Sequence, residues 1–260
     1  MPVHFAGRPC NMKEIYKLSL KYKFKIIEDA SHALGSKIYG KPIGNCKYSS
    51  VCVFSFHPVK NITTAEGGML TTNNKKLFNA ANMLRTHGIN KDKKFFRNKK
   101  APPWFFEQIL LGFNYRMNDL EAALGISQLK KLNYFLLQRN KISKTYNLKL
   151  KNTGLILPKI DKKIFNAFHL YPVRLPSSKE KQKRLSLYKF LKKKGINTNV
   201  HYIPIYQHPY YKKIGFKVKN FPNCEKYYNS SLSLPVYPDL NKKQLNKIVK
   251  LISKFMTFNT

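Results

Sequence analysis

The sequence predicts an α/β protein in which helices cover a buried sheet. Short apolar runs at 24–27, 51–56 and 69–72 end at polar or turn-forming residues, and stretches with helical periodicity lie between them. Hydrophobic residues make up 43% of the 260 residues, which is enough for a sizeable core. Because the strands are mostly continuous apolar runs, we expect the sheet to be buried.

The N-terminal elements follow from local signals. Asn11 is expected to cap an amphipathic helix, and the strand at 24–27 places Asp29 at its carboxyl end. The run 51–56 should break at the Pro58 turn. Functional groups of α/β sheets gather at the carboxyl ends of parallel strands, so this region is where we look for a site.

The middle of the chain is predicted to be helical around one long loop. Helices are expected at 76–85 and from Asn118 toward Leu150, and the loop between them covers 91–103. We place a domain boundary near Gly154, which gives a first domain at 1–153 and a smaller α/β domain at 154–260.

The second domain is predicted to alternate strands and helices. Its expected elements are a strand at 169–173, a helix opened by Ser177 and closed by Gly195, a strand at 197–201 and a final helix capped by Asn241.

The net charge of +37 allows three kinds of partner: nucleic acid, an anionic membrane surface, or a phosphate-bearing small substrate. Of the 49 basic residues 42 are lysine, whereas arginine is preferred for bidentate contacts with bases and phosphates. The lysines are spread along the chain rather than gathered in one tail. This pattern favours a solvated lysine-rich surface, and we expect neither a nucleic-acid nor a membrane partner.

Compartment and metal content are inferred from the cysteines and from the start of the sequence. The four cysteines form no C-x-x-C pair, so we expect free thiols and no zinc site. The first residues form no basic leader, and no apolar run approaches the ~20 residues that cross a bilayer. These features favour a soluble, cytoplasmic protein.

Four residues are candidates for catalysis or cofactor binding: Asp29, His32, Ser55 and Lys60. Pyridoxal phosphate (PLP) needs a lysine for covalent attachment, a carboxylate for its ring nitrogen and hydroxyls or amides for its phosphate. The residues alone leave simpler roles open. Asp29 could cap a turn, Ser55 could be an ordinary strand residue, His32 a partly buried histidine, and Lys60 one of many surface lysines.

Five stretches carry a family resemblance: PVHFAG at 2–7, EDASHALG at 28–35, FSFHPVKNITTAEGG at 54–68, GFNYRMND at 112–119 and HYIPIY at 201–206. Together they resemble the DegT/DnrJ/EryC1/StrS sugar aminotransferases over nearly the whole chain. The resemblance implies the aspartate aminotransferase-like fold of PLP-dependent transferases (fold type I). The chain would then hold part of the large domain and the small C-terminal α/β domain.

Roles for five residues are implied by this resemblance. Lys60 matches the Schiff-base lysine that later acts as acid and base, and Asp29 the partner of the cofactor ring nitrogen. His32 matches the position beside the cofactor ring, and Ser55 a hydroxyl that holds the phosphate. Asn114 matches an asparagine that the other subunit of a homodimer supplies to the phosphate.

The implied activity is transfer of an amino group, from glutamate, to a nucleotide-linked 4-keto-6-deoxy sugar for bacterial surface glycans. Family members carry a sizeable segment ahead of the stretch that matches 2–7, so the resemblance also predicts an N-terminally truncated chain. Two alternatives therefore stay open. One is an inactive or split piece that needs another chain, and the other is a basic nucleic-acid-binding protein, suggested by the charge.

Overall fold

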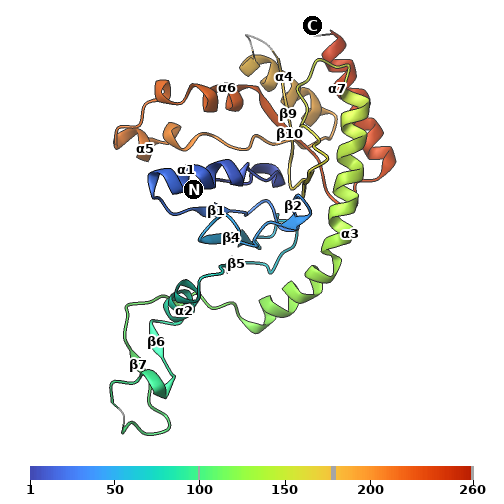
Figure 1. Cartoon of the computed structure of the whole chain (residues 1–260). Coiled ribbons are helices and arrows are strands. Elements are labelled where there is room, and N and C mark those ends of the chain that lie inside the picture. The colour runs from blue at the N-terminus through green and yellow to red at the C-terminus, as the bar shows by residue number, and fades with distance from the viewer. Residues whose placement is uncertain (99, 177–179, 259–260) are drawn as a thin grey trace.

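The computed structural model describes residues 1–98, 100–176 and 180–258 and confirms the α/β class. Its central sheet has the order β1 (Ile27–Asp29), β4 (Val51–Ser55) and β5 (Gly68–Thr71). β1 and β4 are parallel, and β5 is antiparallel to β4 (Figure 1). Val3 adds a parallel bridge to Asp29 at the outer edge of β1.

β1 begins at Ile27, three residues later than expected, and the residues just before it belong to the end of a helix. That helix, α1 (Met12–Tyr22), closes with Lys23 in the left-handed region and with the Phe24 N–H donating to the Ser19 carbonyl. These residues are therefore unavailable to the strand. Asn11 does precede α1, but its side chain makes no capping hydrogen bond, so the expected cap is wrong.

The predicted middle helices are confirmed as α2 (Lys75–Leu84) and α3 (Asp119–Leu150). α3 starts with a complete capping box: the Asn118 side chain accepts from the Glu121 N–H, and the Glu121 side chain accepts from the Asn118 N–H. The side chains that α3 buries begin only at Leu136, in its second half. That half packs into the C-terminal core, so one helix joins the two ends of the molecule (Figure 1).

The C-terminal part alternates strands and helices as expected, and its two strands, at 171–174 and 231–234, form an antiparallel pair. The predicted strand at 197–201 is wrong: among the described residues this segment forms only an isolated bridge between Asn199 and Ser233. The cap of the last helix is confirmed, since Asn241 and Gln244 exchange side chain to backbone hydrogen bonds. The predicted helix start at Ser177 lies outside the described residues. The elements are β9 (Tyr171–Arg174), α4 (Glu180–Lys193), α5 (Pro209–Lys213), α6 (Pro222–Ser230), β10 (Ser231–Leu234) and α7 (Lys242–Phe258).

Two smaller sheets complete the fold. β2 (Lys37–Ile38) pairs with both β3 (Lys41–Pro42) and β8 (Ile164–Phe165). β6 (Ile89–Asn90) and β7 (Glu107–Gln108) form the base of an arm that extends beyond α2 (Figure 1). This arm holds the loop that the sequence predicts.

The buried apolar residues form two clusters. One lies between the central sheet and the first half of α3, and the other contains the C-terminal elements together with Ile142, Tyr146 and Leu150 of α3. The domain boundary near Gly154 stays a prediction. None of the described helices is both long enough and apolar enough to cross a membrane.

Candidate active site

Asp29 is the last residue of β1, and its backbone is held on both sides. The His4 N–H donates to the Asp29 carbonyl at 2.9 Å, and the next residue, Ala30, donates to the Val53 carbonyl at 2.8 Å. The carboxylate accepts a 2.9 Å hydrogen bond from the Ser31 N–H, which is the Asx turn that the simpler interpretation of Asp29 expects. The half-buried side chain also interacts electrostatically with Lys60.

Lys60 lies in the turn after β4, where the Lys60 N–H donates to the His57 carbonyl at 2.9 Å. Its side chain is half-buried, and this burial lowers the pKa of the amine, while the charge of Asp29 opposes the shift. A lowered pKa increases the neutral fraction of the amine, which is the nucleophilic form. Lys60 is therefore no ordinary surface lysine.

The loop that carries Lys60 is closed by a turn at Gly67. Gly67 has φ +150°, and a Cβ there would lie 2.3 Å from the Thr64 hydroxyl oxygen. Glycine is the residue that adopts this conformation without strain. The Gly67 carbonyl then accepts from the Phe56 N–H at 2.8 Å, which returns the chain to the sheet as β5.

His32 is buried in the turn after β1, and its hydrogen bonds fix its tautomer. The Ala6 N–H donates to Nδ1 at 3.2 Å, so Nε2 carries the proton and points to the Tyr202 hydroxyl 3.4 Å away. Burial lowers the pKa of His32 to about 4, with a further contribution from the positive charge of Lys60. His32 is therefore a neutral imidazole at pH 7.

Sequence reasoning missed two further histidines beside this cluster. The His169 ring lies 4.5 Å from the His32 ring, between centroids, and burial lowers the pKa of His169 to about 2. Burial and then Lys60 lower the pKa of His201, whose Nδ1 lies 2.8 Å from the Ser233 hydroxyl. Three of the seven histidines of the chain meet here. They are far apart in the sequence, so only the folded structure shows that they are neighbours.

Ser55 and Asn114 come from other elements than His32. Ser55 is the last residue of β4, half-buried, and its hydroxyl accepts from the His57 N–H at 3.4 Å. Asn114 is exposed at the return of the arm, where its backbone bridges to Thr86. The structure thus brings Asp29, His32 and Lys60 together and leaves Asn114 on an outer surface. The roles of all five residues stay predictions.

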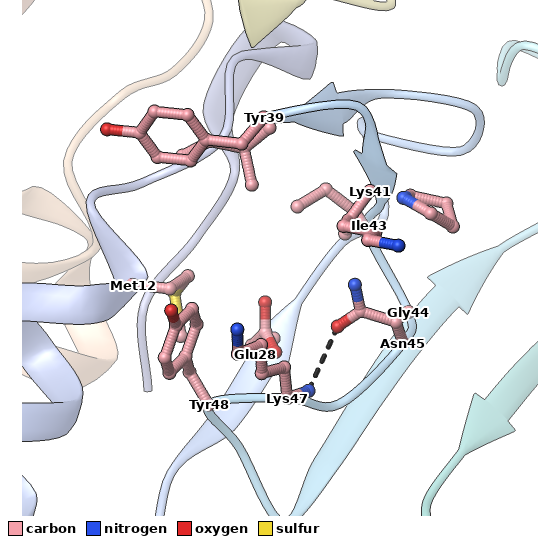
Figure 2. Close-up of a pocket in the computed structure, with 11 residues that line it drawn as sticks. Met12, Glu28, Tyr39, Lys41, Ile43, Gly44, Asn45, Lys47 and Tyr48 are labelled. Atoms are coloured by element: carbon pink, nitrogen blue, oxygen red, sulfur yellow. Dashed lines mark hydrogen bonds between the residues drawn. The ribbon is translucent and has the colours of Figure 1, made fainter. Parts of the chain in front are cut away.

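A small pocket of about 70 Å³ lies on the other side of β1, around Glu28 (Figure 2). His4 accepts the Cys10 N–H at Nδ1 and therefore donates from Nε2 to the Glu28 carboxylate at 2.7 Å. The Ser49 hydroxyl donates to the same carboxylate. Ligand pockets usually exceed ~300 Å³, so this pocket is too small for a cofactor. Glu28 has a structural role.

Comparison with known proteins identifies the family. A model of the DegT/DnrJ/EryC1/StrS aminotransferase family matches residues 1–253. The chain belongs to this family. It is 41% identical to an uncharacterized protein of Methanocaldococcus jannaschii, over 100% of this chain and 67% of that protein. It is 39% identical to a UDP-4-amino-4,6-dideoxy-N-acetyl-beta-L-altrosamine transaminase of Campylobacter jejuni, over 95% of this chain and 62% of the relative.

Solved structures of sugar aminotransferases have the same fold. Helicobacter pylori PseC, an aminotransferase involved in the biosynthesis of pseudoaminic acid, superposes with a TM-score of 0.87 and 31% identity, over 98% of this chain and 66% of PseC. A putative sugar aminotransferase of Streptococcus pneumoniae in its PLP form has a TM-score of 0.88 and 25% identity, over 99% and 68% of the two chains. The chain thus spans about two thirds of the length of the relatives it matches.

The side chains present fit the PLP that this aminotransferase family uses. The cofactor needs an amine, a carboxylate and phosphate donors. Lys60 supplies an amine whose charged form is disfavoured by burial, Asp29 supplies a carboxylate that interacts with it, and Ser55 supplies a hydroxyl at the end of the neighbouring strand. The described residues hold no cluster of three or more metal-ligating side chains.

Proposed function

We propose that this protein is a cytoplasmic PLP-dependent aminotransferase that moves an amino group from glutamate to a nucleotide-linked 4-keto-6-deoxy sugar for surface glycan synthesis. Membership of the aminotransferase family supports the reaction class. The names of the Campylobacter transaminase and of PseC support a sugar of the pseudaminic acid pathway. Because the chain matches only about two thirds of these relatives, the activity is proposed for the assembled protein.

The arrangement of Lys60, Asp29 and His32 is the observation that carries the proposal. A half-buried amine with a lowered pKa, beside a carboxylate and a neutral imidazole, is the set that PLP chemistry requires. A lysine that served only solubility would stay in water, where its amine would keep its ordinary pKa. Desolvation at Lys60 therefore supports a chemical role.

In this proposal some side chains bind the cofactor and Lys60 also transfers a proton. When bound, PLP supplies an electron sink that lets the amino group leave the donor and enter the keto sugar. Lys60 would hold the cofactor covalently, and its amine, when free, would accept and return a proton. Asp29 would keep the cofactor ring nitrogen protonated. His32, held by the Ala6 N–H, would present a fixed neutral ring to the cofactor, and Ser55 would donate to the phosphate.

We further propose a homodimer in which Asn114 serves the site of the other subunit. The exposed position of Asn114 supports this assignment, because a residue that acts across an interface must be reachable from outside its own subunit. The nucleotide sugar and the amino donor would enter where the two subunits meet.

A second candidate is that the 260 residues are an inactive piece that requires another polypeptide. The observation in its favour is the coverage: the chain corresponds to 62% of the Campylobacter transaminase and 66% of PseC. This candidate keeps the same fold and the same residues. It differs in predicting no cofactor attachment by the chain alone.

Borohydride trapping tests both candidates. The purified chain is incubated with PLP, reduced, and mapped by peptide mass spectrometry. A single stoichiometric adduct on Lys60, lost in Lys60→Ala and weakened in Asp29→Ala, would support the proposal. Labelling spread over the surface lysines, or none, would contradict activity of the chain alone and favour the second candidate. Lys192→Ala, on the exposed side of α4, serves as a control that should leave the Lys60 adduct unchanged.

A further inference from the structure

A cavity of about 490 Å³ opens beside α1, in a part of the molecule that the candidate active site does not use. Its lining residues come from two segments, 16–26 and 47–50, and we call it the α1 pocket. It shares Lys47 and Tyr48 with the smaller pocket around Glu28 (Figure 2). Ligand pockets commonly measure ~300–1,000 Å³, so the α1 pocket is large enough for a small organic ligand.

The α1 pocket lies at the opposite end of the central strands from the candidate active site. Its lining residues Ile26 and Ser50 immediately precede β1 and β4, whereas Asp29 and Ser55 are the last residues of these two parallel strands. A strand advances about 3.3 Å per residue, which places Ser50 roughly 16 Å from Ser55 along β4. The α1 pocket is therefore a separate site.

The charged side chains that line the α1 pocket are all positive. Lys23, Lys25 and Lys47 contribute three amines, and no aspartate or glutamate belongs to the lining. Within the part of the chain that the structure describes, none of these three lysines forms an ion pair. The carboxylate behind this wall, Glu28, is buried and accepts a hydrogen bond from Ser49. Three amines without a carboxylate among them attract an anion.

Aromatic and aliphatic side chains lie beside these amines. The rings of Tyr16 and Tyr48 join the two lining segments, with centroids 5.6 Å apart and an angle of 50° between their planes. The Lys47 amine lies 5.3 Å from the centre of the Tyr48 ring. Leu20 and Phe24 are 63% and 43% exposed although both line the pocket. Apolar surface beside a cationic group favours a ligand that has a flat apolar part next to a negative one.

We propose that the α1 pocket is a second, non-catalytic binding site for a nucleoside monophosphate, a planar base that carries a phosphate. The base lies against Tyr16 and Phe24, and the phosphate lies near the amines of Lys25 and Lys47. Single-stranded nucleic acid repeats the same chemistry, but the pocket has the size of one small ligand and its lining includes no arginine, the residue preferred for bidentate phosphate contacts.

Photolabelling with 8-azidoadenosine 5′-monophosphate tests the ligand and its place together. The full chain is labelled without PLP at about 0.15 M salt, where charges more than ~8 Å apart are largely screened, and the modified peptides are mapped. We expect the label within 16–26 or 47–50. Adenosine 5′-monophosphate (AMP) should prevent labelling at a concentration about tenfold lower than adenosine or inorganic phosphate, because only AMP has both the base and the phosphate.

Variants separate the pocket from the general charge of the surface. The double variant Lys25→Glu with Lys47→Glu should bind AMP at least about tenfold more weakly in calorimetry. The matched control is Lys242→Glu with Lys243→Glu, which changes the net charge equally at exposed positions of α7 and should leave the affinity unchanged. Tyr16→Ser should weaken AMP about tenfold and leave the binding of inorganic phosphate unaltered.

Three results would overturn the proposal. An equal loss of AMP affinity in the two double variants would show that the whole surface, and not the α1 pocket, attracts the anion. Label confined to peptides that contain His32 or Lys60 would place AMP in the candidate active site instead. A single-stranded oligonucleotide that binds at least a hundredfold more tightly than AMP would identify nucleic acid as the ligand. None of these measurements requires aminotransferase activity, so they can fail or succeed independently of the proposed function.

Discussion

The rings of His32 and His169 lie 4.5 Å apart with an angle of 45° between their planes, although 137 residues separate them in the chain. His32 belongs to the turn after β1, and His169 lies shortly before β9. Both rings are buried, and protonation of either would place a charge in a site that already holds Lys60 and His201. This contact couples the two ends of the molecule at the candidate site.

We expect stability to fall as the pH drops below 6.5. The folded-state pKa values of about 4 for His32 and about 2 for His169 lie below the ordinary value of 6.5. Between pH 6.5 and 4 these histidines therefore bind protons in the unfolded chain but not in the folded chain. Their full contribution to the free energy of unfolding is present above pH 6.5 and is lost as the pH falls toward 4. Each histidine contributes up to about 1.4 kcal/mol per pH unit in that window. Urea unfolding between pH 7 and 5 measures the slope.

The variant His169→Phe separates this effect from general acid denaturation. It removes one titrating ring and keeps an aromatic side chain, so we expect its stability to depend on pH about half as steeply as that of the unaltered chain. An unchanged slope in His169→Phe would contradict the assignment to these two rings.

Arg139 of α3 is expected to be a major determinant of stability. Its buried guanidinium donates to the carbonyls of Phe168, His169 and Val236 at 2.7–3.2 Å. Arg139→Met would leave three buried carbonyls without this donor, and we expect a loss of about 3 kcal/mol in the free energy of unfolding. Chemical denaturation measures it. Lys149→Met, at an exposed position of the same helix, should change stability by less than about 0.5 kcal/mol.

Mixing two inactive variants tests the shared site. Lys60→Ala and Asn114→Ala should each lack activity in the fully assembled protein. A mixture allowed to exchange subunits should recover about a quarter of full activity, because half of the random dimers are hybrids with one intact site. Aminotransfer to a keto sugar nucleotide is the measurement. Absence of recovery, despite hybrids detected by differential tagging, would show that Asn114 serves its own subunit.

The charge of +37 predicts electrostatic attraction of a nucleotide-linked substrate. We expect kcat/KM to fall severalfold between about 20 and 300 mM salt, with kcat nearly constant, because screening slows encounter rather than chemistry. A neutral amino-acid donor analogue should show a smaller dependence. A kcat/KM that does not change with salt would exclude electrostatic steering. Tight binding of DNA at physiological salt would support the alternative that the protein binds nucleic acid.

Local signals predicted the elements that carry chemistry. Asp29 ends its strand and Ser55 lies in the next strand, as the apolar runs indicate, and the capping box of the final helix forms at Asn241. These features depend on neighbours within a few residues, so periodicity and capping rules can identify them. The family resemblance added the roles of the residues, which composition could not supply.

Two differences from the sequence prediction have different origins. The end of α1 is local: Lys23 is left-handed, the Phe24 N–H donates to the Ser19 carbonyl, and β1 starts at Ile27. The segment 197–201 depends on a distant partner: Asn199 and Ser233 exchange backbone hydrogen bonds, and among the described residues this pairing stays an isolated bridge. The residues of a short segment do not specify how far it pairs with a distant strand.

The sequence by itself determined the α/β class, the placement of Asp29 at a strand end and of Ser55 in the next strand, and the long helix α3. Only the tertiary structure decided that His169, His201 and Tyr202 join His32 and that Lys60 is partly desolvated. The physical reason is that periodicity specifies which side chains avoid water, whereas desolvation depends on which distant segment covers them.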